Sequence, residues 1–290
     1  MSEVPHVFDA ALLRLRRKRA LARGPATFLL ERAADDLAER LATIRRSFAN
    51  VFDFGTPGTD AAAVMMAQDG ARTVASLGGP GDETADLENP ELAAGSYDCV
   101  VSLLALQSVN DLPGVLAQIR RALRPDGLFI AALLGGDTLT ELRAALIDAE
   151  IETTGGASPR VAPFADVRAM GQLLQRAGFA LPVADSETVT VRYDSALDLM
   201  VDLRDMGATN VLVDRSRRPL RRATLLRAVE IYATRFSDAD GRVRATFETI
   251  WLSGWAPHES QRKPLRPGSA TMRLEDALKA ARSSGEGDDA

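Results

Sequence analysis

Val51-Phe52-Asp53-Phe54-Gly55-Thr56-Pro57-Gly58 is an apolar strand that ends in an acid and passes directly into a glycine turn. An alanine-rich helical segment follows, and this strand–turn–helix order is typical of folds that bind nucleotide cofactors. Glycines suit such a turn because the backbone bends tightly and approaches the ligand closely, which a Cβ would obstruct. Pro57 removes one N–H donor and fixes φ, so the sequence predicts a cofactor loop of altered shape.

Beyond this turn, apolar strands alternate with helices, which indicates a parallel sheet covered on both faces. Strands are expected at 51–54, 72–77, 97–106, 128–134, 182–193 and 244–255, and helices at 60–68, 112–123, 138–150, 164–177, 195–206 and 222–236. Residues 78–95 are rich in glycine, proline and acids and leave little room for a helix. Ligands bind beyond the carboxyl ends of parallel strands, here at 55–58, 104–110 and 135–138.

The composition of the 290 residues excludes several classes of protein. A formal net charge of −5 argues against a protein that coats nucleic acid. Cys99 is the only cysteine and lies in an apolar run, so it is expected in the core of a protein from a reducing compartment. His6 and His258 lie far apart, so no histidine metal site is expected. No apolar run reaches the roughly 18 residues of a membrane span and no signal peptide is evident, which favours a cytoplasmic protein.

The N-terminal region is strongly basic. Residues 6–23 mix leucines with arginines and predict a basic amphipathic helix, and a second helix is expected at about 26–46. Two interpretations of the first helix stay open. It presents a solvated basic face over an apolar stripe, or it docks on an acidic partner or on the inner face of the cytoplasmic membrane.

Longer motifs resemble known enzymes. Tyr97-Asp98-Cys99-Val100-Val101-Ser102, Val109-Asn110-Asp111-Leu112-Pro113 and Leu123-Arg124-Pro125-Asp126-Gly127 resemble class I S-adenosylmethionine-dependent methyltransferases. Five further segments are similar to the methyltransferase-like assembly-factor-five family of respiratory complex I: residues 135–143, 155–159, 176–179, 255–261 and 267–270. This resemblance runs from about residue 7 to residue 278. Residues 204–210 resemble, over a shorter stretch, the malonyl-acyl-carrier-protein methyltransferases of biotin synthesis.

The resemblance implies an α/β fold, namely the Rossmann-like class I methyltransferase fold. Its sheet is mostly parallel and seven-stranded with helices on both faces, N-terminal helices and a helical insertion before the last strand. The expected parts are N-terminal helices at 1–46, a cofactor-binding type of core at 47–193 and the insertion at 194–243. A last strand with a family-specific segment at 244–276 and a disordered tail at 277–290 complete the chain.

The resemblance also implies S-adenosylmethionine as cofactor, held by the acid that ends the first strand and by the loops beside it. The implied residues are Asp53, Gly55, Thr56, Gly58, Asp86, Ser102 and Leu103. The family motif is Asp-Leu-Gly-Cys-Gly-x-Gly, and Pro57 and Thr59 replace two of its three glycines. The second strand ends at Ser76-Leu77-Gly78 without the carboxylate that normally accepts the ribose hydroxyls. The acids at 82–88 either substitute for it or form a solvated loop.

Substrate-facing candidates follow the strand ends: Gln107, Asn110, Gly135, Gly136, Asp137, Thr138 and His258. Helix capping is the alternative for Asp137 and Thr138, and a surface position is the alternative for His258. Gln107 and Ser108 replace the family's His-Trp, which removes an aromatic wall. The sequence identifies no catalytic residue, but methyl transfer from an activated sulfonium depends mainly on positioning.

Three functions remain open from the sequence. The first is an enzyme that methylates or arginine-hydroxylates a protein substrate, a complex I subunit, with no nucleic-acid partner. The second is a non-catalytic complex I assembly chaperone on the same fold. The third is an enzyme like the malonyl-acyl-carrier-protein methyltransferases.

Overall fold

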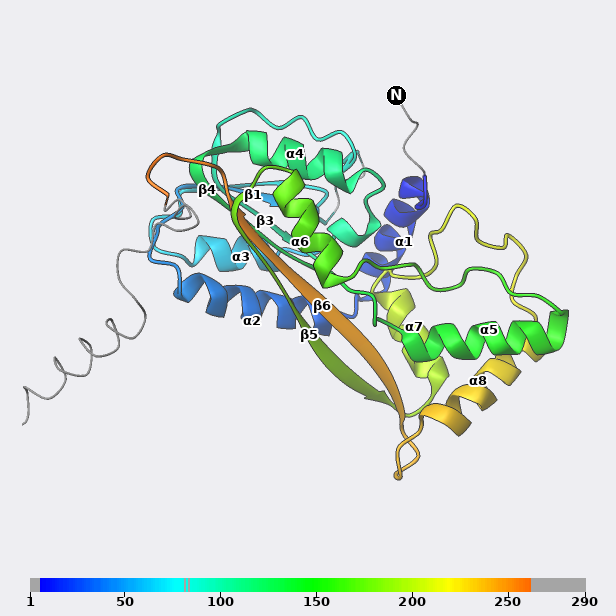
Figure 1. Ribbon diagram of the computed structural model, residues 1–290. Coiled ribbons are helices and arrows are strands. Elements are labelled where there is room, and N and C mark those ends of the chain that lie inside the picture. The colour runs from blue at the N-terminus through cyan, green and yellow to red at the C-terminus, as the bar shows by residue number, and fades with distance from the viewer. Residues whose placement is uncertain (1–5, 81, 83, 262–290) are drawn as a thin grey trace, which may run out of the picture. The chain divides into compact units, whose positions relative to one another are not determined.

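The computed structural model describes residues 6–80, 82 and 84–261. A six-stranded sheet is built in the order β2-β1-β3-β4-β6-β5 (Figure 1). Its strands are β1 (Asn50–Phe54), β2 (Thr73–Leu77), β3 (Tyr97–Leu103), β4 (Leu123–Leu134), β5 (Ala180–Tyr193) and β6 (Val243–Trp255). The first four are parallel to one another, and β6 runs antiparallel to its two neighbours, β4 and β5. The predicted Rossmann-like fold is therefore confirmed.

Eight α-helices and one 3-10 turn accompany the sheet within the described residues. They are α1 (Ala10–Arg23), α2 (Phe28–Ala42), α3 (Asp60–Met66), η1 (Leu106–Ser108), α4 (Leu112–Ala122), α5 (Thr140–Thr154), α6 (Val167–Arg176), α7 (Ala196–Asp205) and α8 (Arg222–Phe236). Capping fixes two of the starts. Asp111 accepts a hydrogen bond from Gly114 N before α4, and Asp166 accepts one from Ala169 N before α6.

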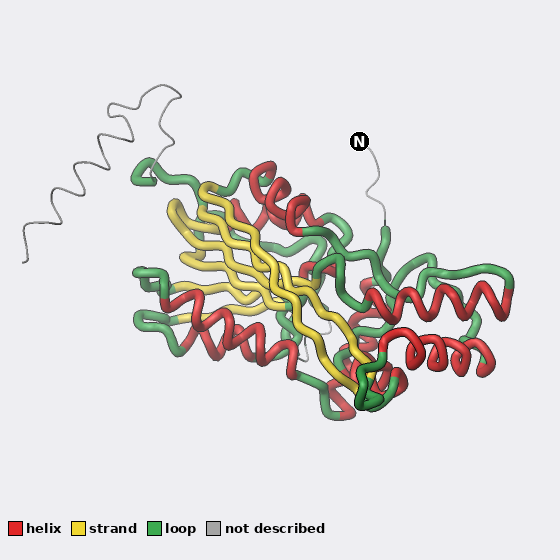
Figure 2. Tube along the Cα trace, turned by 60° about the horizontal axis from the view of Figure 1, so that its bottom comes forward, coloured by secondary structure: helices red, strands yellow, loops and turns green. Residues whose placement is uncertain are grey.

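Alternate residues of the central strands face opposite cores, as the period of a pleated strand requires. On one face Phe129 and Ile250 pack with the apolar sides of α4 and α6. On the other face Val101 and Trp251 pack with α2 and α3. Figure 2 shows helices on both sides of the yellow sheet. A third core lies where α5, α7 and α8 pack around Phe247 at the start of β6, so the predicted helical insertion is built onto the end of the sheet.

The described residues form six strands, not the seven that the family resemblance implied. The physical reason lies in residues 78–95, which carry the glycines, prolines and acids that disfavour regular structure. They contain no helix or strand among their described positions, and the chain passes from β2 to β3 through this loop alone. Residues 124–127, predicted as a turn, interrupt the pairing of β4 with β3. Leu123 pairs with Tyr97 and Leu128 with Cys99, so these four residues lie opposite a single residue of β3.

Helix α1 separates its polar and apolar side chains only in part. Leu15 and Leu21 are 41% and 39% exposed, whereas Arg16 and Arg17 are half-buried. Helix α1 covers the carboxyl edge of the sheet (Figure 1), and Arg17 lines a cavity there together with the loops after β1 and β2. No helix among the described residues is both long and apolar enough to cross a bilayer. The expected tail at 277–290 and most of the family-specific segment lie outside the described residues.

Candidate functional site

The loops after β1 and β2 pack backbone against backbone at the carboxyl edge of the sheet. Gly55 has φ +76°, and a Cβ on it would lie 2.9 Å from Ala105 Cβ. Gly78 has φ +75°, and a Cβ there would lie 3.4 Å from Gly55 Cα. Positive φ and this close approach both require glycine. The glycine positions of the predicted cofactor loop therefore have a structural cause in the packing of the two loops.

Asp53 lies beneath this loop rather than at its surface. Its side chain is 2% exposed, and Oδ1 accepts a hydrogen bond of 2.5 Å from Thr56 Oγ1. Burial raises the pKa of Asp53 to about 6, although the hydrogen bonds from Thr56 act in the opposite direction. Asp53 is thus a buried carboxyl that holds the loop to the end of β1.

Ser102 and Leu103 brace the same loop from β3. Ser102 Oγ donates to the Phe54 carbonyl oxygen at 2.7 Å, and Leu103 N donates to Thr56 Oγ1 at 3.1 Å. Neither residue lines the cavity described next. Five of the seven predicted cofactor residues, namely Asp53, Gly55, Thr56, Ser102 and Leu103, therefore form or brace the loop and do not line the edge cavity.

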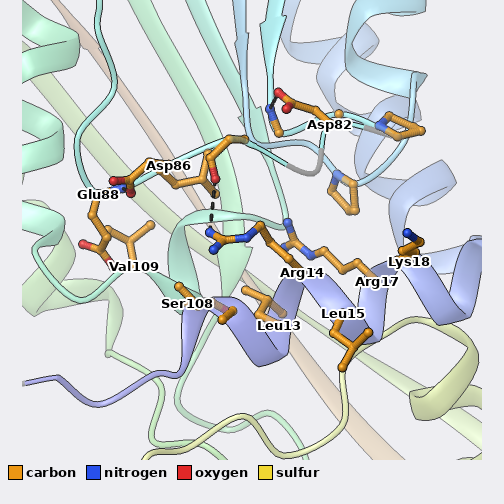
Figure 3. A pocket seen from close by; sticks show the side chains of 18 of the residues that line it. Leu13, Arg14, Leu15, Arg17, Lys18, Asp82, Asp86, Glu88, Ser108 and Val109 are labelled. Carbon is orange, nitrogen blue, oxygen red and sulfur yellow. Dashed lines mark hydrogen bonds between the residues drawn. The ribbon is translucent and has the colours of Figure 1, made fainter.

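A cavity of about 310 Å³, here called the edge cavity, lies between α1 and the loops that follow β1, β2 and β3. Figure 3 shows it with side chains of α1 on one side and the acids of the loop after β2 on the other. Pro57 and Asp86 line it, and Gly58 lines an adjoining cavity of about 160 Å³. Asp86 and Gly58 are thus the two predicted cofactor residues that reach open space.

Helix α1 supplies cations to the edge cavity, from Arg14, Arg17 and Lys18. Arg14 Nη1 donates to the Ala85 carbonyl oxygen at 3.2 Å. Arg17 Nη1 has a longer contact, 3.5 Å to the Gly55 carbonyl oxygen, and burial lowers the pKa of Arg17 to about 10. A desolvated guanidinium with one long hydrogen bond leaves most of its donors available to an anionic ligand.

The acids of the loop after β2 form the opposite wall: Asp82, Asp86 and Glu88. Asp82 accepts from Gly78 N at 3.0 Å, and Asp86 accepts from Glu88 N at 3.0 Å. The hydrogen bond from the Asn89 side chain is the main cause that lowers the pKa of Asp86. This carboxylate therefore stays ionised. Cations facing carboxylates suit a ligand that carries both an anionic group and hydroxyl or amino groups.

A larger cavity of about 490 Å³, here called the apolar cavity, lies on the other side of α1. Leucines of α5 and α7 line it together with Gln107. Gln107 Nε2 donates to the Leu104 carbonyl oxygen at 2.8 Å, and its Oε1 is buried without a partner among the described residues. The arginines that line this cavity are Arg16, Arg160 and Arg204, and no carboxylate is in its described lining.

Most other predicted substrate-facing residues are engaged in structural bonds. Asn110 Oδ1 accepts from Val7 N and Phe8 N, both at 2.8 Å, which ties the chain before α1 to the loop after β3. Asp137 N donates to Glu248 Oε2 at 2.9 Å, and Thr138 Oγ1 lies 3.1 Å from Glu248 N and O.

The remaining predicted substrate-facing residues are two glycines, the residues before α5 and His258. A Cβ on Gly135 would lie 2.5 Å from Glu248 Oε2, and one on Gly136 would meet only backbone oxygens at 3.8 and 3.9 Å. Helix α5 has Leu139 at its N-cap with no side-chain cap bond, so neither Asp137 nor Thr138 caps it. His258 is exposed, and its Nδ1 lies 2.7 Å from Ser260 Oγ within the segment that begins at residue 258.

The arginines of α1 are the residues that sequence reasoning assigned to a surface rather than to a cavity. The spacing of these arginines in the sequence could have indicated that they lie on two different faces of the helix. Arg14 and Arg17 are three residues apart and share one helix face, while Arg16, Arg19 and Arg23 follow one another on another face. No cluster of three potential metal-ligating side chains occurs in residues 6–80, 82 and 84–261.

Comparisons with known proteins agree with this architecture. A family model described as a methyltransferase domain matches residues 26–182. "Arginine-hydroxylase NDUFAF5, mitochondrial" of Danio rerio is 42% identical over 195 residues, which cover 67% of this chain and 60% of the relative. The Homo sapiens protein of that name is 44% identical over 188 residues, 65% of this chain and 54% of its own length. The chain thus spans little more than half of these relatives. A malonyl-acyl-carrier-protein O-methyltransferase of Laribacter hongkongensis (strain HLHK9) is 35% identical over 286 residues, 90% of this chain and 94% of the relative.

Proposed function

Because the chain belongs to the methyltransferase domain family, we propose that it binds S-adenosylmethionine in the edge cavity and acts on a protein substrate. The substrate is a subunit of respiratory complex I, and the reaction is methylation or arginine hydroxylation during assembly. The family model supports methyl transfer, and the name of the hydroxylase relatives supports a reaction at arginine. Because the chain matches little more than half the length of those relatives, the substrate and the reaction are proposals for this chain.

The observation that carries the proposal is the pairing of cations with acids across the edge cavity (Figure 3). S-adenosylmethionine carries a carboxylate at one end and a ribose diol near the other. Arg17 supplies a desolvated cation for the carboxylate, and Asp86 supplies an ionised acceptor for the hydroxyls. The residues present therefore fit the cofactor, although Pro57 contributes no N–H to it.

When bound, the cofactor supplies a methyl group on a positively charged sulfur that needs little further activation. The chain's own residues then have to bind, orient and exclude water. Leu13 and Val109 supply apolar wall to the edge cavity beneath α1. Gln107 offers an unpartnered buried Oε1 at the apolar cavity, where it can accept a hydrogen bond from a substrate. Positioning of this kind contributes a large share of catalysis in bimolecular transfers.

Calorimetric titration of the full chain with S-adenosylmethionine tests the cofactor assignment. We expect binding in the micromolar range. Arg17→Gln should weaken it about 10- to 150-fold, since a hydrogen bond to a charged group contributes about 1.5–3 kcal/mol. Arg72→Gln, the same charge change on an exposed residue at the start of β2, should leave the affinity unchanged. No heat at millimolar ligand would exclude the cofactor.

A non-catalytic assembly chaperone is the second candidate, and two features of the loop favour it. Pro57 lines the edge cavity where a backbone donor is wanted, and Asp53 is buried against Thr56 instead of facing the cavity. Deletion of the gene should lower NADH-dependent quinone reduction whether the protein is an enzyme or a non-catalytic chaperone of complex I assembly. A deletion strain with lowered activity and a protein that binds no S-adenosylmethionine would select the chaperone. Normal quinone reduction in the deletion strain would exclude both complex I proposals.

A malonyl-acyl-carrier-protein methyltransferase-like enzyme is the third candidate. The match to the Laribacter protein covers nearly the whole of both chains. The apolar cavity also suits a short acyl group with a carboxylate, because its charged lining residues are arginines alone. A deletion strain that grows without biotin would exclude this function.

We further propose a cytoplasmic location with peripheral contact between α1 and the inner face of the cytoplasmic membrane. Exposed Leu15 and Leu21 beside Lys18 and Arg19 support such a contact. Fractionation of the native cells tests it, with the protein expected in the soluble fraction at high salt and partly with membranes at low salt. Recovery wholly with membranes at high salt would contradict this location.

A further inference from the structure

Four arginines surround a space of about 350 Å³ on the outer side of α1. Arg16, Arg19 and Arg23 come from one face of α1, and Arg204 comes from α7. Together with Thr209 they form the complete described lining, which we call the arginine cluster. Like charges around one space repel each other, and an anion bound between them would offset that repulsion.

The residues that the structure describes pair with few of these cations. Arg23 pairs with Asp205 at 2.7 Å, whereas Arg19 and Arg204 make no ion pair with any described residue. The charge of Asp9 raises the pKa of Arg16, but the Asp9 carboxylate is also bonded to Arg215 at 3.2 Å and to Leu12 N at the start of α1. Among the described residues, Arg23 is therefore the one arginine of the cluster that forms an ion pair.

Arg16 gives independent evidence that the arginine cluster is a ligand-binding site. Its Nη1 is buried and has no hydrogen-bond partner in the part of the chain that the structure describes. Burial is the main cause that lowers the pKa of Arg16, and the charges of Arg215 and Arg19 lower it further. A buried guanidinium donor without an acceptor is costly, and an anionic oxygen would remove that cost.

The arginine cluster adjoins the apolar cavity and shares lining residues with it. Arg16, Arg204 and Thr209 line both spaces. The apolar cavity is also lined by leucines at the start of α5, within α5 and within α7: Leu139, Leu142, Leu146 and Leu203. A ligand that fills both spaces has an anionic head at the surface and an apolar body inside.

We propose that the arginine cluster binds the phosphate of a phosphate ester whose apolar part enters the apolar cavity. Guanidinium groups pair with phosphate through two parallel N–H bonds, and several of them around one space offer more donors than a carboxylate can accept. The Thr209 hydroxyl adds a neutral donor. This binding does not depend on S-adenosylmethionine or on the reaction proposed above.

Titration of the full chain with methyl phosphate and butyl phosphate tests the proposal. Burial of each methylene strengthens binding about fourfold, so butyl phosphate should bind at least tenfold more tightly than methyl phosphate. Arg16→Gln and Arg204→Gln should each weaken both ligands at least tenfold, and Arg72→Gln should not. Leu220→Trp, which fills the apolar cavity from a half-buried position, should remove the advantage of the butyl group alone.

Equal affinity for the two esters, or affinity unchanged by Arg16→Gln and Arg204→Gln, would overturn the proposal. Vesicles of phosphatidylglycerol distinguish the source of the phosphate. Vesicles that compete with butyl phosphate, and lose binding in the two arginine variants, identify a lipid headgroup. Vesicles that do not compete identify a soluble phosphate ester, and both results keep the phosphate assignment.

Discussion

Replacing Asp53 by asparagine should stabilise the protein at neutral and alkaline pH. The carboxyl has a pKa of 3.8 when unperturbed and of about 6 in the fold, because it is almost completely buried. The folded pKa lies above the unfolded one. The contribution of the protonated Asp53 carboxyl to stability is therefore fully present below pH 3.8 and is lost as pH rises through 6. Ionisation of the buried group at pH 8 therefore costs the folded state about 3 kcal/mol.

Asparagine avoids this cost because it does not ionise, and its Oδ1 can still accept the hydrogen bond from Thr56. Urea unfolding followed by tryptophan fluorescence measures the free energy of unfolding of both proteins between pH 4.5 and pH 8. We expect the advantage of Asp53→Asn to grow by about 2 kcal/mol over that range. A difference that stays flat, or a variant less stable at pH 8, would refute a raised pKa at Asp53.

Glu150→Gln is the matched control of opposite sign. Burial raises the pKa of Glu150, but hydrogen bonds from Arg160 and Ser158 outweigh it and hold the pKa below its usual range. The stability from this ionised group is present above pH 4.5 and is lost at lower pH. Glu150→Gln should therefore destabilise the protein at pH 8, by about 3–5 kcal/mol because Arg160 loses its buried partner, and less in acid.

Three further predictions follow from single contacts. Gly55→Ala should destabilise the protein by about 1–3 kcal/mol, because φ is +76° and the new Cβ would lie 2.9 Å from Ala105 Cβ; unfolding within 0.5 kcal/mol of the parent would contradict this geometry. Cys99 should resist iodoacetamide in the native protein at pH 8, because burial raises the pKa of its thiol and shields it, and should react in urea; rapid native alkylation would show an open core. Asn110→Ala should speed hydrogen exchange at the amides of Val7 and Phe8, which donate to Asn110 Oδ1, while exchange in β3 stays slow.

The order of strands and helices could be predicted because local pattern determines it. Apolar runs such as those of β3 and β4 are buried on both faces, and the amphipathic spacing of α4 turns Val115, Leu116 and Ile119 to the sheet. The glycine turn after β1 could also be predicted from the sequence, since Gly55 has the positive φ that glycine adopts readily. The strand pattern alone indicated six strands, with little room for a helix in residues 78–95, whereas the family resemblance implied seven.

The direction in which each side chain faces could not be predicted in the same way. Asp53 stands at the expected position in the sequence, yet it turns inward because Thr56 offers the nearest donor. Asp137 and Thr138 looked like caps or substrate contacts, but Glu248, from a strand more than a hundred residues away, binds the Thr138 hydroxyl and the Asp137 backbone N–H, while Asp137 itself is exposed. Such contacts between distant segments leave no periodic trace in a single sequence.

The sequence by itself determined the parallel core, the position of the glycine turn and the family, because each depends on neighbouring residues or on a motif. Only the tertiary structure decided that α1 covers the carboxyl edge and turns Arg17 toward one cavity and Arg16 toward another. The physical reason is that a helix sequence gives the angles between its side chains but not the direction from which the sheet is approached. That direction is set by packing of α1 against α7 and by the hydrogen bonds of Asn110, which come from other parts of the chain.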